Sequence, residues 1–216
     1  PQADNLSVII LGRPQTWRIF MLKACASSCT DFLMRHTNIA SSRRPIYLYG
    51  FELLLSTLTS ALSILLVSVL FNGIEDGAIF LLTYIGLRVF CGGYHAKTHE
   101  LCFVSSNFTF FVAWTFAKVL TCLNLQSLAM VLVVLSTIVI LILAPIRNKN
   151  HPLSDKAYRK NRKIAIIFVL VLFIIYLCLT FLNCPLRFLA VFTSSISAVA
   201  VLMVIPKLLE RRENHG

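Results

Sequence analysis

The stretch IAIIFVLVLFIIYLCLTFL, residues 164–182, is apolar almost throughout and contains no charged side chain. A helix rises about 1.5 Å per residue, so a run of this length extends roughly 28 Å, close to the roughly 30 Å hydrocarbon core of a bilayer. The stretch therefore predicts a transmembrane helix. The whole chain agrees with this prediction, because 57% of its residues are hydrophobic and only 13% are charged.

Further apolar runs of this kind follow one another along the chain. Together with Ile164–Leu182, the predicted spans are Tyr49–Leu70, Ala78–Cys91, Cys102–Leu123, Leu128–Ala144 and Phe188–Ile205. The breaks between spans fall at Asn72-Gly73, Asn124–Ser127, Pro145 and Asn183–Pro185. The second span is the weakest, because its cleanly apolar part is only about 14 residues long, a length also typical of buried or re-entrant segments. The fold class is predicted to be all-α, a polytopic membrane protein with six transmembrane helices.

Three regions are predicted along the chain. Residues 1–48 form an N-terminal cytoplasmic segment, in which apolar residues at helical spacing alternate with basic ones and predict an amphipathic, interfacial helix. Residues 49–205 form the six-helix transmembrane domain, and residues 206–216 form a basic cytoplasmic tail. We expect no soluble second domain.

Basic residues predict the orientation, because Lys and Arg accumulate in cytoplasmic loops. All of them except Lys118 and Arg187 fall in the N-terminal segment, in 88–101, in 145–163 or in the tail. Both termini are therefore predicted to be cytoplasmic. Clusters such as residues 159–163 suit anionic lipid headgroups, so the net charge of +11 requires no nucleic-acid partner. Most cysteines lie in spans or on this reducing side, and we expect the thiols to be free.

One polar stretch, RVFCGGYHAKTHELC at residues 88–102, interrupts the apolar pattern. Gly92 and Gly93 favour a bend, which allows His95 to return toward Cys102. The next helix is predicted to start at Thr98, so Cys102 lies near its first turn, where the helix dipole favours a thiolate. An imidazole beside such a thiol can accept its proton. In outline, this is a nucleophilic Cys-His pair.

Other interpretations of the same residues remain open. Cys91, His95, His99 and Cys102 have the spacing C-x3-H-x3-H-x2-C and offer four ligands for a structural zinc ion. His99 is three positions before Cys102 and reaches it without any bend, so it is the geometric alternative to His95 as the base. The plainest interpretation is that the histidines lie at a wet membrane interface and the cysteines simply pack. Spacing alone does not choose between this interpretation, a zinc site and a nucleophilic Cys-His pair.

A peptide transporter or membrane binding protein is the alternative from a different functional class. Predicted spans almost free of charge argue against a coupled ion pathway through the membrane. The chain also lacks the H-E-x-x-H motif of membrane metalloproteases and the G-x-S-x-G motif of serine hydrolases.

Several features, taken in order, make the chain resemble the accessory gene regulator B (AgrB) family of membrane peptidases. The matching positions are Tyr49-Gly50 with Glu52, then Arg88, Gly92-Gly93-Tyr94-His95-Ala96, Cys102, Ala144-Pro145, Asn148-Lys149 and Pro152-Leu153. The resemblance covers roughly residues 47–205. It implies that His95 and Cys102 are the catalytic pair of a cysteine endopeptidase in the bacterial cell membrane.

The resemblance also implies a substrate and a reaction. The substrate is a quorum-sensing (autoinducing) propeptide of the AgrD type, whose C-terminal tail is cleaved through a thioester acyl-enzyme before a thiolactone or lactone ring closes. Membrane lipids and a second copy of the chain, in a homodimer, are the other expected partners. No metal or organic cofactor is implied.

Further residues are assigned candidate roles. Arg88, Gly92 and Gly93 are candidates for oxyanion stabilisation or substrate orientation, against the plainer alternatives of a snorkelling side chain and a simple turn. Candidate substrate-binding residues carry charge on or beside the cytoplasmic face: Glu52, Lys149, Lys156, Arg159 and Lys160.

Overall fold

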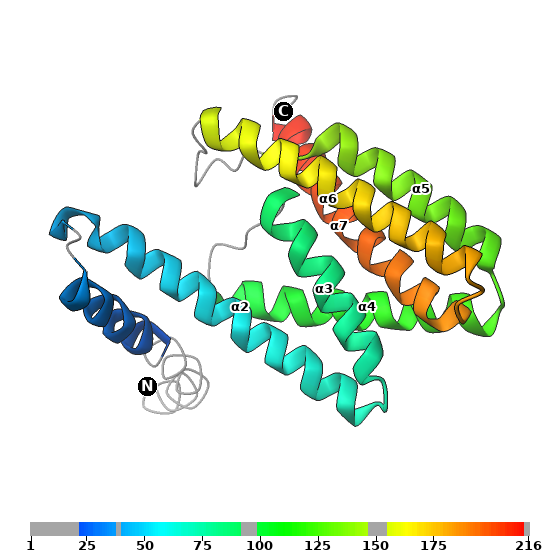
Figure 1. Ribbon diagram of the computed structural model, residues 1–216, viewed down its shortest axis with the longest axis horizontal. Helices are drawn as coiled ribbons and strands as arrows, with labels where there is room; N and C mark the ends of the chain where they lie inside the picture. The colour runs from blue at the N-terminus through cyan, green and yellow to red at the C-terminus, as the bar shows by residue number, and fades with distance from the viewer. Residues whose placement is uncertain (1–21, 38–39, 92–98, 147–154, 214–216) are drawn as a thin grey trace, which may run out of the picture. The chain divides into compact units, whose positions relative to one another are not determined.

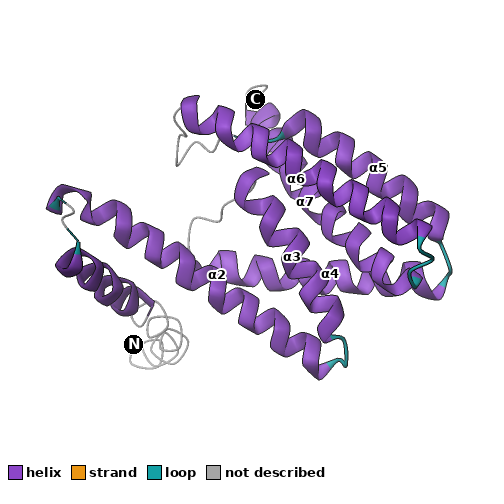
Figure 2. Ribbon diagram, viewed as in Figure 1, coloured by secondary structure: helices purple, strands orange, loops and turns teal. Residues whose placement is uncertain are grey.

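The computed structural model describes residues 22–37, 40–91, 99–146 and 155–213 (Figure 1). Within these ranges the chain is helical apart from short turns, and contains no strand (Figure 2). After a helix over residues 22–36, the elements are η1 (Ser41–Arg43), α2 (Arg44–Leu70), α3 (Ile74–Cys91), α4 (His99–Cys122), α5 (Gln126–Leu143), α6 (Asp155–Phe181) and α7 (Leu186–Glu213). The predicted all-α fold class is confirmed.

Most of these helices are long and apolar enough to cross a membrane. Among the described residues, five candidate spans meet both criteria: Ser41–Leu70, Cys102–Cys122, Gln126–Leu143, Asp155–Phe181 and Leu186–Ile205. Helix α3 corresponds to the remaining predicted span and has 18 residues, but Glu75, Asp76 and Arg88 near its ends shorten its apolar part. The chain is a multi-pass membrane protein, and the predicted number of six spans approximately agrees with this structure.

Three helices end in the same way, each at an asparagine that sequence analysis had placed at a break. Asn72, Asn124 and Asn183 have φ angles of 51°, 50° and 53°, in the left-handed region that asparagine tolerates better than most residues. At each of them the last turn is closed by paired backbone hydrogen bonds, for example from Gly73 N–H to Ser68 O (2.8 Å) and from Asn72 N–H to Val69 O (3.0 Å). These Schellman motifs satisfy carbonyl groups that the helix end leaves unpaired.

The chain divides into two compact units, which are described separately. The first comprises residues 1–62 and 96–105, and the second comprises residues 63–95 and 106–216, so that α2 and α4 contribute to both. In the first unit, Arg44 at the start of α2 donates to the Asp31 carboxylate through Nε (3.0 Å) and Nη2 (2.9 Å), and Nη2 also donates to Ser27 Oγ. Helix 22–36 is thereby held to the start of α2, while its interfacial location stays a prediction.

The second unit is a helical bundle built around α7. Helix α7 packs against α5, α3 and α6, and its apolar segment is the most deeply buried of the candidate spans. Small and polar side chains allow this close approach: Ala190 and Ser195 are fully buried, and Ser136 on α5 hydrogen bonds to Ser197 on α7 (2.9 Å). The outward faces of α5 and α6 are rich in exposed Leu, Ile and Val, as expected for surfaces that contact lipid.

Gly77 brings α3 against α2 and provides a test of this packing. A Cβ atom at Gly77 would overlap Ser68 Oγ and lie 2.7 Å from Ser68 Cβ. We therefore expect Gly77→Ala to destabilise the protein by about 1–3 kcal/mol through overpacking, measured by thermal unfolding in detergent. Gly50→Ala is the matched control, because nothing lies within 4 Å of a Cβ at that position. Equal effects of the two substitutions would contradict the proposed contact.

Candidate functional site

Cys102 is the fourth residue of α4, which begins at His99, one position after the predicted start. Its thiol is free and partly exposed, and the other six cysteines are free as well, as predicted. The positive end of the helix therefore lies close to a partly exposed sulfur. His95, Gly92 and Gly93 lie outside the described residues, as does the side chain of His99, so pairing of His95 with Cys102 stays a prediction.

Arg88 is held along the surface of its own helix by a tyrosine. The guanidinium Nη1 donates to the hydroxyl oxygen of Tyr84 (2.6 Å), four positions earlier, and the guanidinium carbon lies 5.4 Å from the centre of the Tyr84 ring. Tyr84 is buried, whereas Arg88 is only partly buried. The buried Tyr84 therefore orients the Arg88 guanidinium near the end of α3 and limits the number of side-chain conformations that Arg88 can adopt.

The end of α3 is joined to the chain that leaves α5. Ile146 N–H donates to the carbonyl oxygen of Cys91 (3.0 Å), which satisfies one of the carbonyls that the last turn of α3 would leave unpaired. Cys91, Ala144 and Pro145 are buried around this contact. Ile146, the last described residue before the basic segment, therefore lies beside the end of α3.

The candidate substrate-binding residues fall into two groups. Lys156, Arg159 and Lys160 are exposed on the first turns of α6, where Arg162 and Lys163 extend the same positive surface. Glu52 lies in α2 and is half-buried. Lys149 lies outside the described residues. The exposed cations form a surface that attracts acidic peptides or anionic headgroups.

The zinc alternative receives no further support from the described residues. Within the described ranges, no group of three or more His, Cys, Asp or Glu side chains is placed to hold a metal ion. Cys91 is fully buried at the end of α3. Two of the proposed ligands are the undescribed His95 and the side chain of His99, so the four-ligand arrangement is untested.

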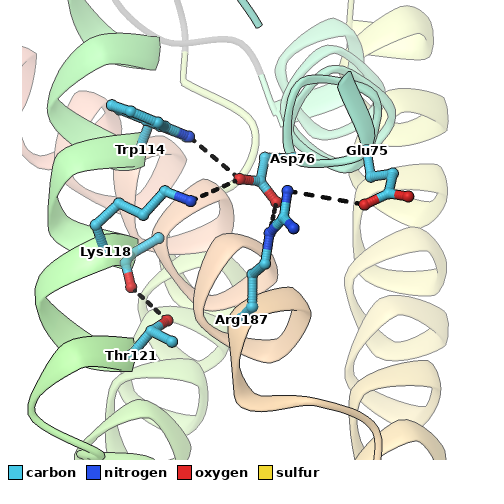
Figure 3. A network of polar contacts seen from close by, with 7 residues as sticks. Glu75, Asp76, Trp114, Lys118, Thr121 and Arg187 are labelled. Carbon is cyan, nitrogen blue, oxygen red and sulfur yellow. Dashed lines mark hydrogen bonds and ion pairs between the residues drawn. The ribbon is translucent and has the colours of Figure 1, made fainter. Parts of the chain in front are cut away.

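A charged cluster that the sequence analysis missed lies at the other end of α3 (Figure 3). The carboxylate of Asp76 is fully buried and accepts hydrogen bonds from Arg187 Nε at Oδ1 (2.9 Å), and from Lys118 Nζ (3.3 Å) and Trp114 Nε1 (3.2 Å) at Oδ2. Arg187 also lies 3.7 Å from the Glu75 carboxylate. Lys118 and Arg187 are the two basic residues that departed from the predicted charge asymmetry.

The comparisons with known proteins agree with the sequence resemblance. The sequence model of Accessory gene regulator B (AgrB) matches residues 26–207. A protein named "Putative AgrB-like protein" from Clostridium perfringens (strain SM101 / Type A) is 25% identical over 148 residues, which cover 66% of this chain and 69% of the relative. "Putative AgrB-like protein 2" from Clostridium perfringens (strain 13 / Type A) has the same identity and coverage.

No solved structure matches the chain. The family match nevertheless extends over most of the sequence and includes the segment from Arg88 to Cys102. The chain is therefore a multi-pass membrane protein of the accessory gene regulator B family, whose members take part in processing quorum-sensing propeptides.

Proposed function

We propose that the protein is a membrane cysteine endopeptidase that removes the C-terminal tail of an AgrD-type propeptide and promotes ring closure. Cys102 is the nucleophile and His95 is its base. The observation that carries the proposal is the free, partly exposed Cys102 thiol in the first turn of α4, directly after the Gly-Gly-Tyr-His segment, in a chain of this family. The partial positive charge of the helix start lies near the sulfur that the proposed attack uses.

The first chemical step forms an acyl-enzyme. His95 accepts the proton of the Cys102 thiol, and the sulfur attacks the carbonyl carbon of the peptide bond that precedes the tail. The C–N bond then breaks, and the departing amine takes the proton back from the imidazolium. The upstream part of the propeptide remains bound to Cys102 as a thioester.

The second step closes the ring. A Cys thiol or Ser hydroxyl within the propeptide loses its proton and attacks the thioester carbonyl, so that the new C–S or C–O bond replaces the bond to Cys102. With a thiol nucleophile, one thioester is exchanged for another at nearly equal energy. Binding must therefore order the peptide and keep water away from the thioester, because hydrolysis would give a linear product.

Intact mass of the propeptide after incubation with the reconstituted protein tests this function. We expect loss of the tail, together with a retained fragment whose mass is one water lower than that of the corresponding linear acid. A linear acid alone would support cleavage without cyclisation. An unchanged propeptide would contradict the peptidase proposal and favour a transport or binding role.

Arg88 is proposed to orient the substrate or to stabilise the oxyanion, with Gly92 and Gly93 as candidate backbone donors. Its partner Tyr84 would then position the guanidinium rather than act on substrate. We expect Arg88→Met to lower kcat by roughly 10²- to 10³-fold, as loss of an oxyanion donor does. We expect Arg88→Lys to lose at least about tenfold, because an ammonium group lacks the planar fork of donors. Unchanged cleavage by Arg88→Lys would remove this role.

The basic surface of α6 is proposed to bind acidic residues of the propeptide. Lys156, Arg159 and Lys160 are exposed there, and undescribed Lys149 is proposed to act with them. Glu52 is proposed to contact a basic group of the peptide. The contact between Ile146 and Cys91 supports this assignment, because it holds the last described residue before the basic segment at the end of α3.

Neutralising three cations tests the basic surface. We expect the triple variant Lys156→Gln/Arg159→Gln/Lys160→Gln to raise KM about tenfold at low salt with kcat nearly unchanged, because each lost charge weakens attraction and encounter. The difference from wild type should shrink as salt increases, since exposed charges are screened. A matched control replaces three exposed cations of the first unit, Lys23, Arg35 and Arg43. Equal changes in KM for both triples would contradict a specific surface on α6.

A further inference from the structure

The buried carboxylate of Asp76 joins three helices of the second unit at one point. We call Asp76, Trp114, Lys118 and Arg187 the Asp76 clamp; its members come from α3, α4 and α7 (Figure 3). Each carboxylate oxygen is used, with Arg187 on Oδ1 and both α4 donors on Oδ2. A fully buried carboxylate is costly without such partners, so the clamp strongly favours one arrangement of these helices.

Two of the clamp's contacts depend on the rotation of α4. Trp114 and Lys118 are four positions apart, so they lie on one face of α4, and Lys118 Nζ also lies 5.0 Å from the Trp114 ring centre. Rotation or sliding of α4 against α3 would therefore break both contacts together. The clamp is specific for the position of α4 and is not a general surface ion pair.

Helix α4 belongs to none of the most closely packed helix pairs of the described residues. The close helix pairs in the described part of the chain are α5–α7, α3–α7, α3–α6, α5–α6 and α6–α7. Helix α4 meets α2 and α3 through longer side chains, with ring centres 5.1 Å apart for Phe80 and Phe110, and a 2.9 Å hydrogen bond from Ser63 to Asn107. Loss of the clamp would remove both contacts that α4 makes with the buried carboxylate of Asp76.

We propose that Asp76 and Lys118 are positioning residues for α4, the helix that carries the proposed nucleophile Cys102. Helix α4 is continuous from His99 to Cys122 and carries Cys102 in its first turn, so a clamp near its other end fixes the rotation of the helix that bears the proposed nucleophile. Asp76 and Arg88 are 12 positions apart, roughly 18 Å along α3. The clamp therefore acts through helix position and touches no reacting atom.

The consequence for catalysis rests on the proposed function, because a misplacement of about 1 Å can cost roughly 10²-fold in rate. We expect Lys118→Met, which keeps the length of the side chain and removes its charge, to lower kcat about tenfold to hundredfold with little change in KM. Lys118→Arg restores a cation and should return kcat to near the wild-type value. Asp76→Asn should have at least the effect of Lys118→Met, since it weakens contacts to α4 and α7 together.

A distance measurement tests the same proposal without activity. Spin labels replace Val89 on α3 and Phe108 on α4, both exposed, in protein whose seven native cysteines have been replaced. We expect Lys118→Met to broaden or shift this distance distribution and Lys118→Arg to restore it. Labels at Leu135 on α5 and Ile174 on α6, also exposed, are the control pair and should not change.

Each result decides the proposal. An unchanged distance between positions 89 and 108 in both Lys118→Met and Asp76→Asn would overturn it, whatever happens to kcat. Equal changes in the control pair would also overturn it, because the variants would then loosen the whole bundle. If even the wild-type protein processes no propeptide, the proposed function fails, while the distances still decide whether the clamp positions α4.

Discussion

Replacing Cys102 by alanine is expected to abolish propeptide processing, with a loss of at least about 10³-fold. The reason is that the proposed reaction forms a bond to the Cys102 sulfur, and no neighbouring group replaces a covalent nucleophile. The measurement is intact mass of the propeptide after incubation with each variant. Cys102→Ser is the stricter variant, because it keeps a hydroxyl nucleophile of similar size and tests the need for a thiolate.

Two controls separate this result from other causes of lost activity. Cys178→Ala removes another exposed free thiol, in α6, and should process the propeptide normally. A chelator should leave wild-type processing unchanged if Cys102 acts as a nucleophile. Processing that persists in Cys102→Ala would contradict the assignment, and processing that stops with chelator would favour the zinc arrangement of Cys91, His95, His99 and Cys102.

Replacing His95 by alanine is expected to lower kcat by about 10²- to 10⁴-fold, the usual contribution of a positioned general base. His99→Ala should retain most activity, although His99 begins the same helix as Cys102 and is three residues away from it. Both variants are compared at saturating propeptide, so that changes in binding do not enter. A large loss in His99→Ala with an active His95→Ala would reverse the assignment of the base.

The helices and their ends could largely be predicted from sequence, because both depend on local properties. A run such as residues 164–182 is apolar enough to predict a helix by itself, and Asn72, Asn124 and Asn183 were expected at breaks. The helices extend beyond the apolar runs, since α6 starts at Asp155 and α7 reaches Glu213 inside the predicted basic tail. Hydropathy locates the apolar part of a helix, whereas hydrogen bonding continues into polar turns.

The Asp76 clamp could not be predicted from local pattern, because its residues lie far apart in the sequence. Hydropathy treats Asp76 as a charged residue at a helix end, yet its side chain is fully buried once Lys118 and Arg187 pair with it. One signal was available: these two cations were the exceptions to the charge asymmetry, and Asp76 lies in the break assigned to the same side of the membrane. An unexplained cation near a predicted span is therefore a reason to search for a buried carboxylate partner.

The candidate site was partly predictable. The helix start predicted at Thr98 correctly placed Cys102 near the beginning of a helix. This prediction was possible because helix capping depends on neighbouring residues. The pairing of Tyr84 with Arg88 could also have been predicted from sequence, because residues four positions apart share a helix face. The contact between Ile146 and Cys91 joins segments more than fifty residues apart, and nothing in the local sequence indicates it.

The central claim is that Cys102 becomes acylated by the propeptide. Intact mass of the protein itself, taken after rapid acid quenching of a reaction with propeptide whose ring nucleophile is replaced by alanine, tests it most directly. We expect an added mass one water lower than that of the linear acid without the tail, removed by hydroxylamine as a thioester and absent from Cys102→Ala. Tail release with no such adduct in the wild-type protein, or an equal adduct on Cys102→Ala, would contradict this mechanism.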